Sequence, residues 1–260
     1  MKILLQEMST TELADALEGC DTILLPVGSI EQHGAHLPLF TDSHIAFEIS
    51  KRTAESLSED FPVLVAPLVP FGSSVEHRGY PGTISLRPST FLELIEDVCR
   101  DLAGMGFRKI VLVNGHGGNT GYLGSHVFEI ADDTNTFLAV FDWLLTGLGR
   151  ELKDNYLETG PDVHAGELET SILMATWPEG VNEDKITEAL PRKFSEEKGF
   201  RHLVLDDPDV AGFSWFSDEV SEKGVIGDPT KATEAKGEAI IEEIVERLGN
   251  VLREIEEMDV

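Results

Sequence analysis

The chain has 260 residues, 41% of them hydrophobic and 7% aromatic, which is enough for one large α/β domain or two small ones with a sizeable core. Asp and Glu number 48 against 20 Lys and Arg, so the formal net charge is -28. Such a surface repels nucleic-acid phosphates and anionic lipid headgroups, which excludes the electrostatic basis for binding either. The acidic residues are spread along the chain beside a normal apolar content, which argues against disorder and favours adaptation to molar salt over an ordinary acidic protein.

The sequence favours a soluble, cytoplasmic protein. Its first residues lack the apolar region and cleavage site of a secretory signal, and no apolar run approaches the roughly 20 residues that span a bilayer. Cys20 and Cys99 are isolated in the sequence, so we expect two buried, reduced thiols rather than a disulfide.

The first half of the chain predicts two strands separated by a helix. Residues 9–12 have capping-box spacing, so a short helix begins there and ends at Gly19. Two continuous apolar runs, at residues 22–27 and 63–66, suit strands that are buried on both faces. The segments between these strands are a polar, His-rich loop and a helix, at residues 28–42 and 45–57.

The second half repeats this alternation after a long loop rich in Gly and Pro. The expected elements are, in chain order, the loop at residues 67–88, a helix at 89–104, a strand at 108–113, a Gly-rich loop at 114–119, a helix, a strand at 136–141, a helix at 167–176, an irregular stretch at 182–222 and a helix at 231–257.

Strands that alternate with helices predict an α/β fold with a mostly parallel sheet and helices on both faces, in three layers. We find no internal repeat or low-complexity linker, so residues 1–260 are expected to form one domain. In such sheets the reactive site lies in loops beyond the carboxyl ends of the strands. The two His-bearing loops, after the first and third strands, occupy that place.

The first of these loops carries three candidate metal ligands. Glu31 and His33 alternate, so in an extended segment both side chains point the same way, and Asp42 could bridge to a second ion. The alternative for any one of them is a polar surface loop that caps a helix. Three such residues directly after a buried strand favour the metal site.

The second loop, residues 114–119, contains His116 among glycines that allow close approach of a ligand. A Gly-rich loop before a helix can also bind phosphate. This one lacks the Lys-Ser/Thr ending of a P-loop and carries a His instead, so a metal role for His116 is preferred.

A third segment places His164, Glu167 and Glu169 at the start of a helix. The two acids could simply favour the helix N-terminus. That explanation suits Glu167 better than Glu169, whose neighbours alternate with apolar core positions.

Five sequence blocks together resemble the signature of the creatininase family of amidohydrolases, and they span most of the chain in the family's order. The blocks are Glu31-Gln32-His33-Gly34 with His36-Leu37-Pro38 and Asp42, Val75-Glu76-His77 with Tyr80-Pro81-Gly82-Thr83-Ile84-Ser85, Asn114-Gly115-His116-Gly117-Gly118-Asn119, His164-Ala165-Gly166 with Glu169-Thr170-Ser171, and Gly224-Val225 with Gly227-Asp228-Pro229.

The resemblance implies a compact α/β sandwich, assembled as a hexamer, with two divalent metal ions side by side in each subunit. It implies that Glu31 and His116 bind one metal, that His33 binds the other, and that Asp42 bridges them. His164 matches the family's catalytic histidine. Carboxylate and imidazole ligands suit zinc, iron and manganese alike.

One position departs from the pattern of creatininase itself, where a Glu two residues after the histidine matching His116 completes the second site. Gly118 stands there in this chain. We therefore expect Glu169, with Glu167 as the alternative, to supply the missing ligand. The departure argues against creatinine as the substrate, as does the lack of a counterpart near His164 for the tryptophans that close the creatininase pocket.

The reaction that these residues imply is hydrolysis of an amide C–N bond by a water that two metals activate. Backbone N–H groups of Ser73 and Ser74 are expected to stabilise the oxyanion, and His164 to give a proton to the leaving nitrogen. Other candidates for substrate contact are His36, His77, Gly117 and Gly118; packed, hydrogen-bonded histidines are the alternative for the first two.

The substrate is harder to predict. The family includes creatinine hydrolases, a peptidase of mycofactocin maturation, and a formamide hydrolase acting on a formylamino-pyrimidine nucleotide in archaeal riboflavin and deazaflavin biosynthesis. The acidic surface and Gly118 favour the formamide hydrolase, with Arg78 or the Gly-rich loop contacting the phosphate. An alternative of another class is a metal-dependent binding protein without turnover.

Overall fold

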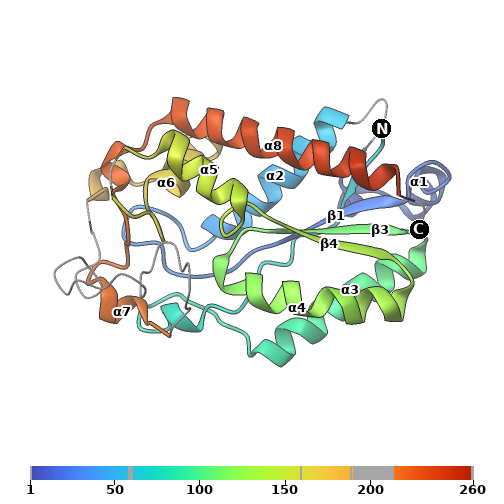
Figure 1. Cartoon of the computed structure of the whole chain (residues 1–260), viewed down its shortest axis with the longest axis horizontal. Coiled ribbons are helices and arrows are strands. Elements are labelled where there is room, and N and C mark those ends of the chain that lie inside the picture. The colour runs from blue at the N-terminus through green and yellow to red at the C-terminus, as the bar shows by residue number, and fades with distance from the viewer. Residues whose placement is uncertain (1, 58–60, 159, 188, 190–213, 259–260) are drawn as a thin grey trace.

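The computed structural model describes residues 2–57, 61–158, 160–187, 189 and 214–258. Four parallel strands form one sheet in the order β2-β1-β3-β4 (Figure 1). Their bounds are Thr22–Val27 for β1, Leu64–Val65 for β2, Lys109–Asn114 for β3 and Phe137–Asp142 for β4. The predicted strands are confirmed to within one or two residues at each end.

Alternation along the strands divides the interior into two cores. Ile23 and Leu25 of β1 pack into one core, and Leu24 packs into the other. In β3, Ile110 belongs to the first core and Val111 to the second. Both faces of the sheet are therefore apolar, which explains why these strands appear in the sequence as unbroken hydrophobic runs.

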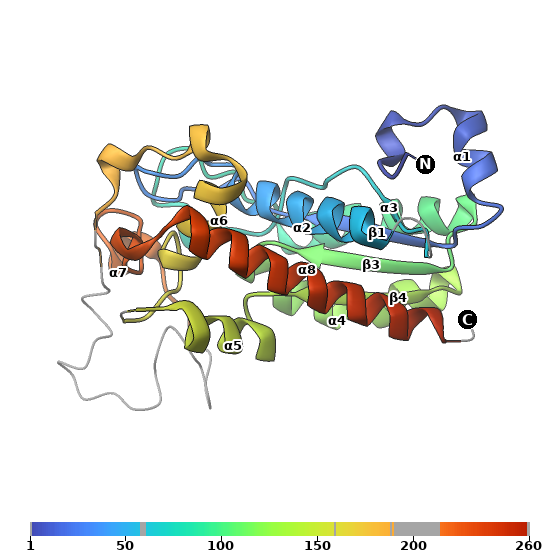
Figure 2. The same ribbon diagram turned by 90° about the horizontal axis from the view of Figure 1, so that it is seen from above.

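Helices cover both faces of the sheet, as Figures 1 and 2 show. On one face lie α2 (Thr41–Leu57), α5 (Gly147–Tyr156), α6 (Glu167–Thr176) and α8 (Glu234–Glu256). On the other lie α3 (Pro88–Met105) and α4 (Gly117–Thr134). The predicted three-layer α/β fold is confirmed.

Short elements account for most differences from the sequence prediction. The capping box at Ser9 and Glu12 starts α1 (Thr10–Ala16) as expected, whereas α2 begins four residues earlier than predicted and so includes Asp42 in its first turn. Elements that were not predicted are α5, α7 (Ser217–Val220) and the 3-10 helices η1 (Leu5–Glu7), η2 (Val75–His77), η3 (Pro178–Gly180), η4 (Glu183–Lys185) and η6 (Pro229–Lys231). Much of the irregular stretch at 182–222 lies outside the described residues.

The strand order places the two His-bearing loops side by side. The chain leaves β1 for β2 on one side and later returns to β3 on the other, so the order reverses between β1 and β3. At that point the last residues of the two strands, Val27 and Asn114, are partners in the register. Ligand sites of open α/β sheets lie at such reversals.

Two smaller expectations also bear on the fold. Cys20 and Cys99 are buried free thiols, as predicted. No helix among the described residues is long and apolar enough to cross a membrane.

Candidate metal centre

Three of the predicted ligands meet where β1, β3 and α2 converge. Glu31 follows β1, Asp42 lies in the first turn of α2, and His116 is the residue before α4. His116 Nε2 is 3.3 Å from Glu31 Oε2, and His116 Nδ1 is 3.3 Å from Asp42 Oδ2. All three side chains are buried, and one atom of each lies close enough to the others to hold a single ion.

A second group shares Asp42 with the first. His33 Nε2 lies 3.0 Å from Asp42 Oδ1 and 3.9 Å from Glu169 Oε1. Asp42 thus presents one oxygen to each group, which is the arrangement of a bridging carboxylate.

Glu167 has a different environment from Glu169. Its carboxylate pairs with Lys236 and accepts a hydrogen bond of 3.1 Å from the backbone N–H of Glu158. These contacts join α6 to α8 and to the chain before it. Of the two acids weighed from the sequence, Glu169 is therefore the one that faces the centre.

The chemistry of these residues fits divalent cations. Glu31 Oε1, His33 Nε2 and Asp42 Oδ2 are inaccessible to solvent and have no hydrogen-bond partner. Within the described part of the chain, no Lys or Arg lies within 4.0 Å of the Glu31, Asp42 or Glu169 carboxylates. Buried polar atoms that make no hydrogen bond are costly, and carboxylates with imidazoles are the usual ligands of zinc, iron and manganese.

The pKa values of these groups describe how the centre holds protons when it lacks cations. Burial raises the pKa of Asp42, and the Glu31 carboxylate raises it further, to about 7. Burial alone would lower the pKa of His116, but the charges of Glu31 and Asp42 outweigh it and raise that pKa to about 10. Burial would raise the pKa of Glu31, but the charges of nearby His116 and His77 outweigh it and leave that pKa well below its usual value. Protons on His116 and Asp42 therefore partly neutralise a centre rich in carboxylates.

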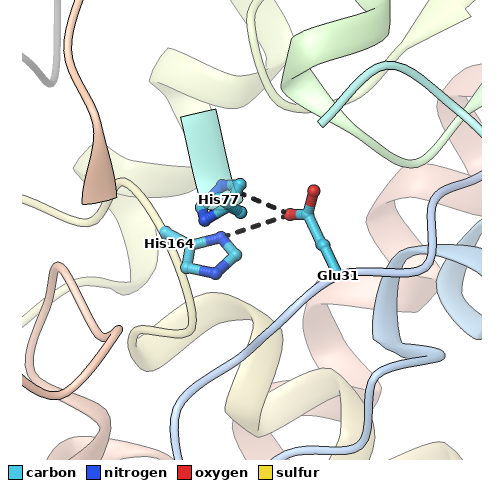
Figure 3. A group of neighbouring side chains, drawn as sticks. All are labelled: Glu31, His77 and His164. Atoms are coloured by element: carbon cyan, nitrogen blue, oxygen red, sulfur yellow. Dashed lines mark ion pairs between the residues drawn. The ribbon is translucent and has the colours of Figure 1, made fainter. Parts of the chain in front are cut away.

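His164 lies against the same centre. Figure 3 shows His164 and His77 directed at one oxygen of Glu31, at 3.6 Å from His164 Nδ1 and 3.5 Å from His77 Nε2. The Nε2–H of His164 donates to the Gln32 carbonyl at 2.6 Å. Burial, and then the charge of His33, lower the pKa of His164 to about 4, so its ring is neutral and Nδ1 is free to accept a proton.

Hydrogen bonds hold the two histidines that were predicted as candidates for substrate contact, His77 and His36. His77 Nδ1 lies 3.0 Å from Gln32 Nε2 and 2.7 Å from Ser217 Oγ, which leaves Nε2–H to point at Glu31. His36 Nε2 lies 3.0 Å from Thr170 Oγ1 on α6, and burial lowers the pKa of His36 to about 4. His77 thus faces a metal ligand, while His36 links the first loop to α6.

The backbone at Ser73 and Ser74 is already engaged. Ser73 N–H donates to Asn119 Oδ1 and Ser74 N–H donates to Ser85 Oγ, each at 2.9 Å. Both N–H groups are therefore occupied, which differs from the expectation that they stabilise the oxyanion. Instead the Ser73 carbonyl and the Ser74 hydroxyl lie 3.0 and 3.2 Å from His116 Nε2 and orient that ring.

The glycines of the second loop meet different neighbours. A Cβ at Gly117, the first residue of α4, would touch only the side chain of Leu145, at 3.4 Å. A Cβ at Gly118 would lie 2.4 Å from His116 Nε2, so a side chain there would enter the centre.

Sequence reasoning missed two residues of the site. Glu76 lies on η2 with its carboxylate 3.6 Å from His116 Nε2. Asn119 accepts from Ser73 N–H and donates to the Gly28 carbonyl at 3.0 Å, which ties two loops to the first turn of α4. Both lie inside the quoted sequence blocks, Glu76 next to His77 and Asn119 at the end of the Gly-rich block, and that position was the available signal.

The profile of the creatininase family, described as creatinine amidohydrolase, matches residues 6–252. The chain belongs to the creatininase family. It is 34% identical to the mycofactocin precursor peptide peptidase of Mycolicibacterium smegmatis, over 86% of this chain and 81% of that protein. It is 27% identical to the creatinine amidohydrolase of Pseudomonas putida, over 89% of this chain and 88% of that protein.

Solved structures of this family share the fold. A creatininase mutant complexed with creatine superposes with a TM-score of 0.81 at 25% sequence identity, covering 98% of each chain. A zinc–zinc form of a creatininase mutant superposes with a TM-score of 0.80 at 25% identity, again over 98% of each chain. The chain is thus a creatininase-family hydrolase, and its buried ligand groups lie at the centre described above.

Proposed function

We propose that this chain hydrolyses the C–N bond of a small amide at a centre of two divalent cations. One cation would be held by Glu31 and His116, the other by His33 and Glu169, with Asp42 between them. The observation that supports this most strongly is that two ligand groups approach opposite oxygens of Asp42, while buried atoms of Glu31 and His33 make no hydrogen bond.

Bound cations would polarise the amide carbonyl and lower the pKa of a water molecule toward neutrality. The protein's own part is to move the proton. Because His164 uses Nε2–H to bond Gln32, its Nδ1 is the atom that takes up a proton beside Glu31 and delivers it to the leaving nitrogen. His77, held by Ser217, keeps the Glu31 carboxylate in place.

The leading substrate that we propose is the formylamino-pyrimidine nucleotide. Arg78 supports it, because this exposed residue directly follows His77 and its guanidinium makes no hydrogen bond or ion pair with the described residues. In a chain with a net charge of -28, an arginine that follows His77 and has no carboxylate partner among the described residues suits the phosphate of a nucleotide.

A second candidate is an amide bond in a peptide. It is favoured by the 34% identity to the mycofactocin precursor peptide peptidase, which exceeds the 27% identity to the creatinine amidohydrolase. An exposed Arg78 is equally suited to a peptide carboxylate, so the residues of the centre do not separate these two substrates.

The experiment is a substrate panel with protein kept in concentrated potassium chloride and loaded separately with zinc, iron(II) and manganese. We expect formate release from the nucleotide, with creatinine untouched. Cleavage of short peptides without formate release would replace the nucleotide by the second candidate. Absence of hydrolysis across the whole panel would instead support a metal-dependent binding protein.

We also propose a homo-oligomer, a hexamer by resemblance to the family. Light scattering of the protein in concentrated potassium chloride tests this, and a monomer would contradict it.

A further inference from the structure

Glu76 differs from the other acids of the centre in its exposure. Its side chain is 18% exposed, against 1% for Glu31, 2% for Asp42 and 7% for Glu169. It comes from η2, whereas the ligand residues come from the ends of β1 and β3 and from α2 and α6. Glu76 is therefore the carboxylate of this group that lies nearest to solvent, where a substrate enters.

The position of Glu76 depends on Gly118. A Cβ at residue 118 would lie 2.5 Å from Glu76 Oε1 and 2.5 Å from the Ser73 carbonyl. Only glycine leaves this space open, and the Glu76 carboxylate fills it. Glu169, by contrast, contacts His33 and the backbone N–H of Ala165. The acid that takes the place of a side chain at residue 118 is thus Glu76.

A role in orienting the His116 ring does not explain the presence of the Glu76 carboxylate. The Nε2 atom of His116 already lies within hydrogen-bonding distance of the Ser73 carbonyl and the Ser74 hydroxyl, whereas Glu76 is 3.6 Å away. Among the described residues, no Lys or Arg lies within 4.0 Å of the Glu76 carboxylate. A largely buried carboxylate with so little pairing has a free oxygen for another molecule.

We propose that Glu76 is a further catalytic residue, which accepts a hydrogen bond from the N–H of the amide that is cleaved. An ionised carboxylate can only accept hydrogen bonds, so it attracts the amide N–H and repels the amide carbonyl oxygen. It therefore turns the nitrogen of the substrate toward η2 and the carbonyl toward the ligand cluster. This role rests on the proposed amide hydrolysis.

The first test compares Glu76→Gln with Glu243→Gln in the metal-loaded protein. Glu243 is a matched control, because its side chain is 21% exposed and lies on α8, where it contacts Tyr156 and Arg247 rather than the centre. Loss of a charged hydrogen bond predicts that Glu76→Gln lowers kcat/KM by about 10- to 100-fold while both variants keep the wild-type metal content. Equal kcat/KM in the two variants, or loss of metal from Glu76→Gln alone, would overturn the assignment.

A second test needs no turnover. Cobalt(II)-loaded protein is titrated with N-methylformamide, which has an N–H, and with N,N-dimethylformamide, which has none, and the visible absorption of the cobalt reports binding. We expect the wild type and Glu243→Gln to prefer N-methylformamide, and Glu76→Ala to bind both compounds alike. A wild type without this preference would overturn the role of Glu76. If the preference is present but the substrate panel shows no hydrolysis, the proposed function fails while the contact stands.

Discussion

At the scale of single residues, Asp42 joins the two ligand groups, since one of its oxygens faces His33 and the other faces His116. Its position at the second residue of α2 matters for this. A residue one position further along the helix would point about 100° away, and neither histidine could then share the carboxylate.

Replacing His116 by Ala should remove bound metal and activity together, because the ring contributes to the Glu31–Asp42 group. Metal analysis of the purified variant measures this. His126→Ala is the control, because that histidine lies on α4 beside Glu96 and Glu129, outside the centre. Full metal occupancy in the His116 variant would rule out His116 as a ligand.

Adding one methyl group at Gly118 should also weaken metal binding, because the methyl group would crowd the side chain of His116. The new Cβ would lie 2.4 Å from His116 Nε2 and close to a backbone carbonyl that cannot move aside cheaply. We expect Gly118→Ala to weaken metal binding at least about tenfold, which corresponds to roughly 1.4 kcal/mol. Gly121→Ala on the same helix meets no atom within 4 Å and should keep wild-type affinity. Equal affinities in the two variants would contradict this crowding.

Metal binding should release protons, and more of them at lower pH. A ligand must lose its proton before it binds a cation, so affinity falls as the pH drops below the pKa of that ligand. Without metal, Asp42 has a pKa of about 7 and His116 of about 10. Both should therefore release a proton at about pH 6. At about pH 8 the release comes from His116 and from His33. Burial would lower the pKa of His33, but the Asp42 and Glu169 carboxylates outweigh it and raise that pKa well above its usual value. Calorimetry in buffers of different ionisation enthalpy counts these protons, and a release that does not change with pH would contradict the assignment.

The candidate ligands could be predicted from sequence because each lies in a loop after a recognisable strand or in the first turn of a helix. Glu31 and His116 follow apolar runs, and Glu169 lies in the first turn of a helix. Glu76 could not be found this way, because its role depends on Gly118, which is distant in sequence and has no side chain. Sequence likewise could not reveal that the Ser73 and Ser74 N–H groups already donate hydrogen bonds, since their acceptors lie on other segments.

At the scale of elements, the packing of α8 on α6 sets the position of Glu169. The two helices approach so closely at Gly237 that a Cβ there would lie 1.8 Å from the Ser171 carbonyl oxygen. Lys236, the residue before this glycine, pairs with Glu167 at the start of α6. The first turn of α6 is thus fixed from outside the centre.

Gly237→Ala should therefore destabilise the protein despite the higher helix propensity of Ala. Overpacking against a backbone costs about 1–3 kcal/mol, more than the roughly 0.5–1 kcal/mol gained from removing a helical glycine. Chemical denaturation measures the change in unfolding free energy. Gly124→Ala, with nothing within 4 Å, should be neutral or stabilising. A stabilised Gly237 variant would mean that the two helices are not held at this distance.

The long elements were predictable because their hydrophobic patterns are regular. The strands were found as apolar runs and α6 was found with its observed bounds. The short 3-10 helix η2 has no repeating pattern over its three residues, so sequence periodicity could not reveal it. The helix α5 was missed because it interrupts a stretch of turns after β4.

At the scale of the whole molecule, the charge of -28 creates self-repulsion that added salt screens. The Debye length falls from about 10 Å at 0.1 M to about 3 Å at 1 M ionic strength. We therefore expect the midpoint of thermal unfolding to rise as potassium chloride increases over this range. Differential scanning calorimetry tests this, and a midpoint that stays constant or falls would contradict adaptation to salt.

The reversal of strand order between β1 and β3 also has a consequence for divergence within the family. Ligands attached to the strand ends and to buried helices are constrained by both cores, whereas Glu76 and Arg78 belong to a short segment at the rim. Mutations can therefore accumulate at the rim without disturbing the cores. In this arrangement, lineages that keep one set of metal ligands can acquire different substrates by exchanging a few residues on η2 and the neighbouring loops.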